Sequence, residues 1–85
     1  MANPLIKSVA STIRKFRKAK GMSQEELAHI SGLDRTYISG VERGIRNITL
    51  ESLEQIIKAL DIHNSDFFKA VIEEDSSDIH DKHER

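Results

Sequence analysis

The segment SQEELAHISGLDRTYISGVE, residues 23–42, carries the most informative pattern in this chain. Ser23 is followed three residues later by Glu26, which is the spacing of a capping box at the start of a helix. Gly32 interrupts the helical pattern, because glycine favours the left-handed conformation at a helix end. Asp34 is a residue type that caps the next helix. The segment therefore predicts two short helices joined by a tight turn.

The apolar residues of this segment are spaced so that the two helices pack against each other. Ala28 is small where two helices must approach closely, Leu27 and Leu33 flank it, and we expect Ile30 to be buried with them. Ile38 and Val41 form the inward pair of the second helix, expected over residues 35–42. This pattern is typical of a helix-turn-helix.

The outward side of the second helix carries polar groups suited to the edges of DNA bases. If Ile38 and Val41 face inward, the outer side holds Arg35, Thr36, Ser39 and Arg43. A single helix fits a DNA major groove about 12 Å wide, where base edges present distinct donors and acceptors. Gly40 keeps part of this side low, so we expect close approach to DNA. The alternative is a pair of packed helices with an ordinary polar surface.

Helical spacing also predicts three further helices. One covers about residues 5–20 and ends at Gly21, one begins after the cap Thr49, and one begins after Asn64 or Ser65. Apolar residues at helical spacing mark the inward faces of the first two: Leu5, Val9, Ile13 and Phe16, then Leu50, Leu53, Ile56, Ile57 and Leu60. The last helix carries Phe67, Phe68, Val71 and Ile72. Only Ile79 is apolar from residue 75 to 85, which predicts an acidic, disordered tail after a domain of residues 1–74. The fold class predicted is a compact all-α domain of five helices.

Composition narrows the possible functions. The chain has 85 residues, 38% hydrophobic and 32% charged, and no cysteine. One small domain leaves no room for a two-lobed enzyme, and we find no nucleophile–base pair, so we predict a protein that is not an enzyme. We also expect no metal, no cofactor, no membrane segment and no secretory signal, and therefore a cytoplasmic protein.

Charge is divided unevenly along the chain. Residues 1–48 hold nine Lys or Arg and four Asp or Glu, a balance of +5, whereas residues 49–85 hold four and ten, a balance of −6. A basic half points to an anionic partner. Lys15, Arg17 and Lys18 with Lys20 could add long-range attraction to it, or they could form a solvated face.

A longer stretch, RKFRKAKGMSQEELAHISGLDRTYISGVERGIRNITLESLEQIIKAL (residues 14–60), resembles the lambda-repressor/Cro helix-turn-helix family. More narrowly, it resembles the controller proteins of restriction–modification systems. The likeness covers about residues 5–73. It implies a five-helix, lambda-repressor-like DNA-binding domain that dimerises through its C-terminal helices and binds a palindromic operator in double-stranded DNA. It also implies regulation of the protein's own gene and of the endonuclease gene, with two dimers on adjacent sites at high occupancy.

The base-contacting candidates lie on and after the second helix of the motif. Arg35 is the first, because a bidentate Arg–guanine contact is the commonest specific one. Thr36 and Ser39 offer hydroxyls that could contact bases or their own helix backbone. Arg46 could contact a base or a phosphate.

Other residues are candidates for the DNA backbone. The resemblance implies a phosphate contact for Gln24 and favours a DNA contact for Tyr37, which could instead pack into the domain. Arg43, Asn47 and Thr49 surround a helix start, where free N–H groups suit phosphate.

Two points stay open. Phe67, Phe68, Val71 and Ile72 are more apolar groups than one short helix buries, so we predict a dimer interface there, the alternative being that all of them close the monomer core. Glu25 could contact RNA polymerase or a neighbouring dimer, or only improve the helix dipole. The alternative functions are a phage or host repressor of the same fold and a protein-binding helix-turn-helix, such as an antitoxin or adaptor.

Overall fold

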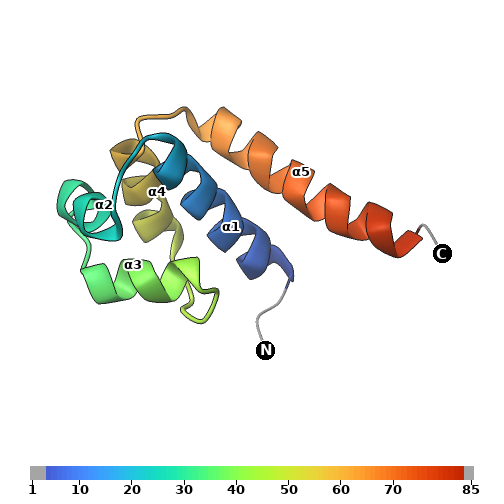
Figure 1. Cartoon of the computed structure of the whole chain (residues 1–85), viewed down its shortest axis with the longest axis horizontal. Helices are drawn as coiled ribbons and strands as arrows, with labels where there is room; N and C mark the ends of the chain where they lie inside the picture. The colour runs from blue at the N-terminus through green and yellow to red at the C-terminus, as the bar shows by residue number, and fades with distance from the viewer. Residues whose placement is uncertain (1–3, 84–85) are drawn as a thin grey trace.

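The computed structural model describes the backbone of residues 4–83 and the side chains of residues 4–74. The described residues form five helices and the loops between them (Figure 1). The helices are α1 (Pro4–Ala19), α2 (Gln24–Ser31), α3 (Arg35–Glu42), α4 (Leu50–Ala59) and α5 (Asn64–His83). The all-α prediction and the bounds of the two motif helices are confirmed.

Local sequence signals account for the helix ends. At α2, the Ser23 hydroxyl accepts from the Glu26 N–H and the Glu26 carboxylate accepts from the Ser23 N–H, so the capping box is complete. Thr49 caps α4 by accepting from the Ser52 N–H. Asp34 stands at the N-cap position of α3 without a side-chain capping bond. The Ser23 and Thr49 caps satisfy N–H groups that a helix start leaves unpaired.

The ends of α3 and α4 differ in the residue that turns the chain. Gly44 follows α3 with a φ of 74°, and the Ile45 N–H bonds back to the Gly40 carbonyl at 3.1 Å. This is the Schellman pattern that glycine allows without strain. After α4 the corresponding residue is Asp61, with a φ of 59°. A side chain in that conformation carries a steric cost.

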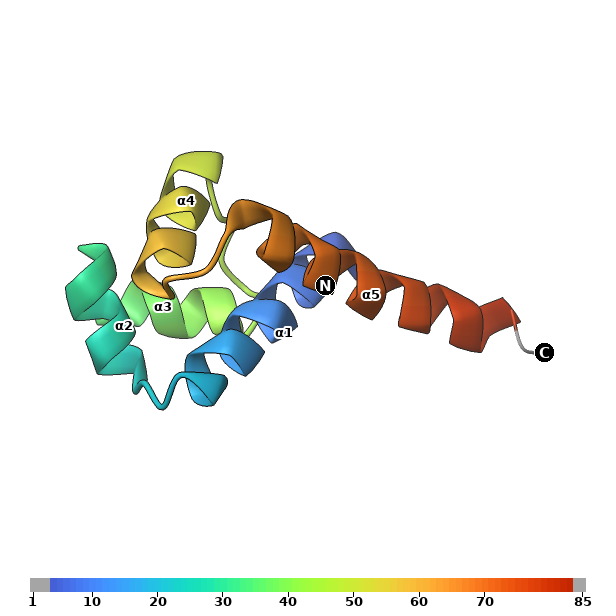
Figure 2. The same cartoon turned by 90° about the horizontal axis from the view of Figure 1, so that it is seen from above.

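The core lies where the five helices meet, and α2 contributes Leu27 and Ala28 to it. Its largest fully buried side chains are Phe67, Ile13, Leu27, Ile38, Ile56, Leu60 and Thr12. Helix α5 runs along α1 in both views of the molecule (Figures 1 and 2). The rings of Phe16 and Phe67 stack there, with centroids 6.2 Å apart. One apolar face from each helix is therefore enough to close the domain.

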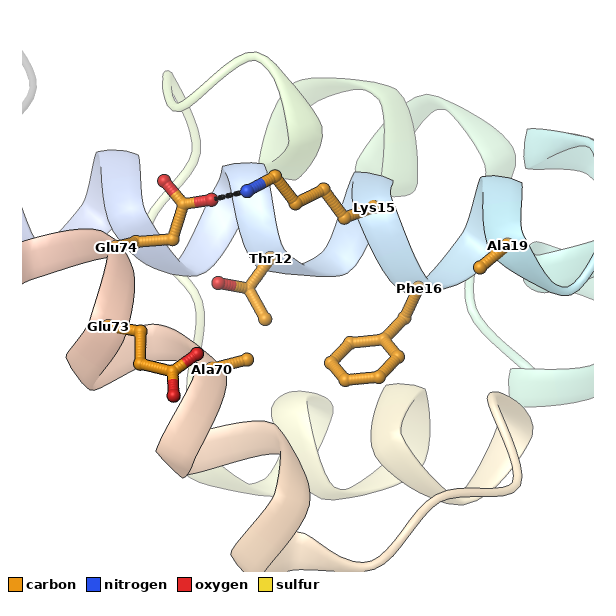
Figure 3. A pocket seen from close by; sticks show the side chains of 7 residues that line it. All are labelled: Thr12, Lys15, Phe16, Ala19, Ala70, Glu73 and Glu74. Atoms are coloured by element: carbon orange, nitrogen blue, oxygen red, sulfur yellow. Dashed lines mark ion pairs between the residues drawn. The ribbon is translucent and has the colours of Figure 1, made fainter. Parts of the chain in front are cut away.

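Polar contacts also join α5 to α1. Lys15 forms an ion pair with Glu74, and the Ser11 hydroxyl donates to the same carboxylate at 3.3 Å. Beneath the ion pair, Thr12, Phe16 and other residues line a cavity of about 510 Å³ between the two helices (Figure 3). No helix among the described residues is long and apolar enough to cross a membrane.

Three residues expected on inward faces are instead exposed. Leu5 is 61% exposed, Ile30 55% and Leu50 82%. Leu5 and Leu50 lie in the first turns of α1 and α4, and Ile30 lies near the end of α2. Helical spacing predicts a shared face, but the ends of a helix can project past the neighbours that cover its middle.

Helix α5 continues to His83, through the segment for which the sequence predicted a disordered tail. The prediction rested on the scarcity of apolar residues, which governs packing rather than backbone conformation. Once α5 has begun at Asn64, each added residue gains one backbone hydrogen bond without a new nucleation cost. Residues 84 and 85 lie outside the described part. The division into a domain of residues 1–74 and a tail stays a prediction.

Candidate nucleic-acid interface

Helix α3 separates a buried face from an exposed polar face. Ile38 is fully buried and Val41 is 3% exposed, as the sequence predicted. Arg35 and Thr36 are exposed in the first turn, while Ser39 is half-buried. The exposed first turn of α3 is therefore free to carry donors to a ligand.

A buried carboxylate anchors the other end of α3. Glu42, which is 3% exposed, accepts from Arg17 Nε at 2.6 Å and from Arg17 Nη2 at 3.0 Å. Gln24 Nε2 donates to the same carboxylate at 3.1 Å, and Arg14 Nη1 donates to the Glu42 carbonyl. Arg17 also donates to the Met22 carbonyl at 2.7 Å. Charge-assisted, bidentate contacts of this kind fix orientation as well as position, so α1 and α2 hold α3 at a defined angle.

These contacts correct the expectation for Arg17 and refine the expectation for Gln24. Arg17 does not belong to a solvated basic face with the neighbouring lysines, because only 8% of it is exposed. Helical spacing could have revealed that each residue is buried, though not that they pair. Arg17 continues the i, i+4 series of Val9 and Ile13, and Glu42 lies four residues after Ile38. Gln24 has one amide hydrogen committed to Glu42, and the NH₂ group retains a second donor.

The loop after α3 folds back onto that helix. The Tyr37 hydroxyl donates to the Asn47 carbonyl at 3.4 Å, and the Arg46 guanidinium carbon lies 5.2 Å from the centre of the Tyr37 ring. Tyr37 is half-buried, whereas Arg46 and Asn47 are exposed. Tyr37 therefore packs in the domain and supports the loop, which was one of the two alternatives for it.

Gly40 does not form the open low point that the sequence suggested. It is buried, and the stem of Arg46 covers it. The prediction failed because helical spacing places Gly40 on α3 but contains nothing about the loop that returns over it.

The remaining candidates surround the start of α4. Arg43 and Thr49 are exposed, like Arg46 and Asn47. The Thr49 hydroxyl is used within the cap, since it also donates to Ser52 Oγ at 3.0 Å. Glu25 is exposed in the first turn of α2. Within the described residues, no group of three His, Cys, Asp or Glu could hold a metal ion.

The four apolar residues predicted as a dimer interface divide into two pairs. Phe67 is fully buried and Val71 is 5% exposed, so both belong to the monomer core. Their side chains are not available to a partner, which corrects the prediction for these two. Phe68 and Ile72 remain 43% and 63% exposed. The difference arises because residues one apart on a helix point in different directions, and only one of those directions faces α1 and α4.

Phe68 borders a second cavity, of about 320 Å³, between α4 and α5. Leu50 lies beside it and is the most exposed large apolar residue of the described chain. Leu50, Phe68 and Ile72 are called the apolar surface below.

Comparison with known proteins adds sequence and structural relatives. A family model described as helix-turn-helix matches residues 13–65. Control protein C.SmaI of Serratia marcescens is 52% identical over 52 residues, which are 61% of this chain and 62% of that protein. Control protein C.BamHI of Bacillus amyloliquefaciens is 43% identical over 67 residues, 78% of this chain and 83% of that protein. The alignment thus spans less than two thirds of C.SmaI and more than four fifths of C.BamHI.

Solved structures of one more relative match most of the chain. The wild-type restriction–modification controller protein C.Esp1396I is 51% identical, with a TM-score of 0.81 over 82% of this chain and 92% of that one. The C.Esp1396I tetramer in complex with its natural 35 base-pair operator matches with a TM-score of 0.81 and 51% identity, over 84% and 93% of the two chains.

Proposed function

This chain belongs to the lambda-repressor-like helix-turn-helix family, and on that basis we propose that it is a restriction–modification controller protein that binds operator DNA. The proposed activity is the regulation of transcription, and not catalysis. The protein would control its own gene and the endonuclease gene, and it would act in the cytoplasm, beside the DNA that it regulates. The observation that carries the proposal is the exposed first turn of α3, where Arg35 and Thr36 face outward while Ile38 and Val41 bury the opposite face.

Base contacts are assigned to the side chains that α3 and its following loop expose. Arg35 would contact guanine, Thr36 and Ser39 would contact neighbouring bases, and Arg46 would add a contact from the loop. The Arg35 assignment is supported by its exposure at the start of α3, and the Arg46 assignment by its place over Tyr37.

Phosphate contacts are assigned to the residues around this face. Gln24 would donate its second amide hydrogen to a phosphate while the first stays on Glu42. Arg43, Asn47 and Thr49 would contact phosphates near the N-terminus of α4. Tyr37 would contact the backbone through its hydroxyl only by giving up its bond to the Asn47 carbonyl.

A homodimer would form through the apolar surface. Three apolar side chains of α4 and α5 are exposed, namely Leu50, Phe68 and Ile72. A second copy of the chain that packs on them would remove them from water. Each dimer would place two α3 helices about 34–36 Å apart, one turn of DNA. Two dimers would occupy adjacent sites on a longer operator.

The experiment that tests the function is selection of bound duplexes from a random pool, followed by gel-shift titration of the selected duplex. We expect a palindromic duplex, discrete larger complexes on tandem copies, and binding that weakens steeply with salt as counterions are released. Enrichment of no sequence above non-specific binding would overturn the proposal and favour a protein-binding module.

A further inference from the structure

We propose that Gly40 is a positioning residue for Arg46: the absent Cβ leaves a notch on α3 in which the stem of Arg46 lies. The notch would hold the Arg46 guanidinium in one place before DNA arrives. This inference rests on the proposed function, because it concerns how one side chain of the DNA-binding face is held.

The space at Gly40 is too small for any other residue while Arg46 stays where it is. A Cβ on Gly40 would lie 2.6 Å from Arg46 Cγ, 3.5 Å from its Cβ and 3.7 Å from its Cδ. Carbon atoms in contact prefer separations of about 3.5–4.0 Å. Since Cγ is the first atom beyond Cβ, Arg46 could not avoid the clash by swinging its far end; its side chain would have to leave the notch by another χ1 rotamer or move with its loop.

Three further contacts define where Arg46 lies. The Ile45 N–H bonds to the Gly40 carbonyl, and the Tyr37 hydroxyl bonds to the Asn47 carbonyl, so both neighbours of Arg46 are tied to α3. The guanidinium lies over the Tyr37 ring. Because Tyr37 and Gly40 are three residues apart on one face of the helix, the Arg46 side chain crosses a full turn of α3.

The direction of this crossing places the Arg46 charge near the proposed DNA-binding face. Tyr37 lies N-terminal to Gly40, so Arg46 carries its charge back toward the first turn of α3, where Arg35 and Thr36 are exposed. A side chain already held in its binding position loses less conformational freedom on binding. Glycine inside a helix is less favourable than alanine, so its presence here calls for a compensating gain.

The first test measures thermal unfolding of four proteins without DNA: wild type, Gly40→Ala, Arg46→Ala and the double variant. With Arg46 present, we expect Gly40→Ala to lower Tm, because the new Cβ meets Cγ. In the Arg46→Ala background, that Cγ atom is gone and the remaining contact of 3.5 Å is ordinary. Gly40→Ala should then raise Tm by about 4 °C through its better helix propensity. The same change in both backgrounds would overturn the notch.

A second measurement follows Arg46 directly by NMR of the free protein. Protons above an aromatic ring are shifted upfield, so the Arg46 side-chain resonances should move toward ordinary values in Gly40→Ala. Unchanged resonances would contradict the inference, since an effect of Gly40 on helix stability alone would not move Arg46 off Tyr37.

The third measurement is the affinity of the same four proteins for the selected duplex. We expect Gly40→Ala to lose ~fivefold or more in the wild-type background and less than twofold in the Arg46→Ala background. An equal loss in both backgrounds would show that Gly40 acts without Arg46 and would overturn the inference. If the wild-type protein selects no duplex, that result alone overturns the proposed function. The unfolding and NMR measurements still determine whether Gly40 positions Arg46.

Discussion

The carboxylate of Glu42 lies at the junction of three helices and illustrates how single residues control this small domain. It is the last residue of α3, and it accepts hydrogen bonds from Arg17 of α1 and Gln24 of α2. Removing one partner of a buried pair leaves an uncompensated charge, whereas replacing both with apolar groups is often tolerated. The pair therefore matters most for orientation.

Substitution of Arg17→Met should destabilise the protein by about 3–5 kcal/mol, because Glu42 would stay buried without its guanidinium. The double variant Arg17→Met, Glu42→Leu should recover most of that loss. Urea unfolding of the wild type and both variants measures the difference. Equal stability of the single and double variants would contradict this account of the pair.

Substitution of Arg35→Ala should weaken binding to the selected duplex by about 1–3 kcal/mol and relax the preference at one base pair of each half-site. Lys58→Ala is the matched control, since it removes one exposed positive charge from α4. Repeating the duplex selection with each variant measures the preference. A loss of equal size on random DNA would assign Arg35 to phosphate instead of bases.

At the scale of elements, the residues that end α3 and α4 differ in backbone strain. Glycine ends α3 without strain, whereas Asp61 follows α4 with a φ of 59°. Its N–H bonds to the Lys58 carbonyl, and its carbonyl accepts from Lys20 Nζ at 3.5 Å. Both contacts use the backbone, so a glycine could keep them.

We therefore expect Asp61→Gly to be more stable than Asp61→Ala by about 1 kcal/mol. Both variants remove the carboxylate, so their difference isolates the cost of a Cβ in the left-handed conformation. Thermal unfolding followed by circular dichroism measures it. An Asp61→Ala variant as stable as the glycine variant would mean that the loop relaxes out of this conformation.

For the whole molecule, the division of charge and the apolar surface lie in different parts of the chain. The basic half contains α1–α3, and the acidic half contains α4 and α5, which also carry Leu50, Phe68 and Ile72. A dimer formed through α4 and α5 would leave the basic helices available to DNA. Its acidic side would be repelled by phosphate and would not compete for that contact.

Substitution of Phe68→Glu should convert the proposed dimer to monomers, because it places a charge in the centre of the apolar surface. Ile30→Glu is the matched control, since Ile30 is a comparably exposed apolar residue on α2. Sedimentation velocity at a range of concentrations measures the oligomeric state of each. A Phe68→Glu variant that stays dimeric would show that the interface lies elsewhere on the protein.

Features that depend on a few neighbouring residues could be predicted from the amino-acid sequence. The capping box of Ser23 and Glu26, the cap Thr49 and the inward faces of Ile38 and Val41 were all predicted. The resemblance carried by residues 14–60 predicted the family. Each of these signals arises within one or two helical turns, where backbone geometry and spacing leave few alternatives.

Contacts between residues far apart in the sequence could not be predicted, and only the tertiary structure shows them. Arg17 and Glu42 are 25 positions apart, and nothing local showed that they pair. The crossing of α5 over α1 buried Phe67 and left Phe68 exposed, although both are aromatic neighbours in sequence. The return of the loop after α3 covered Gly40 with Arg46. These outcomes depend on the angles at which helices and loops come together, and those angles are set by the packing of the whole core.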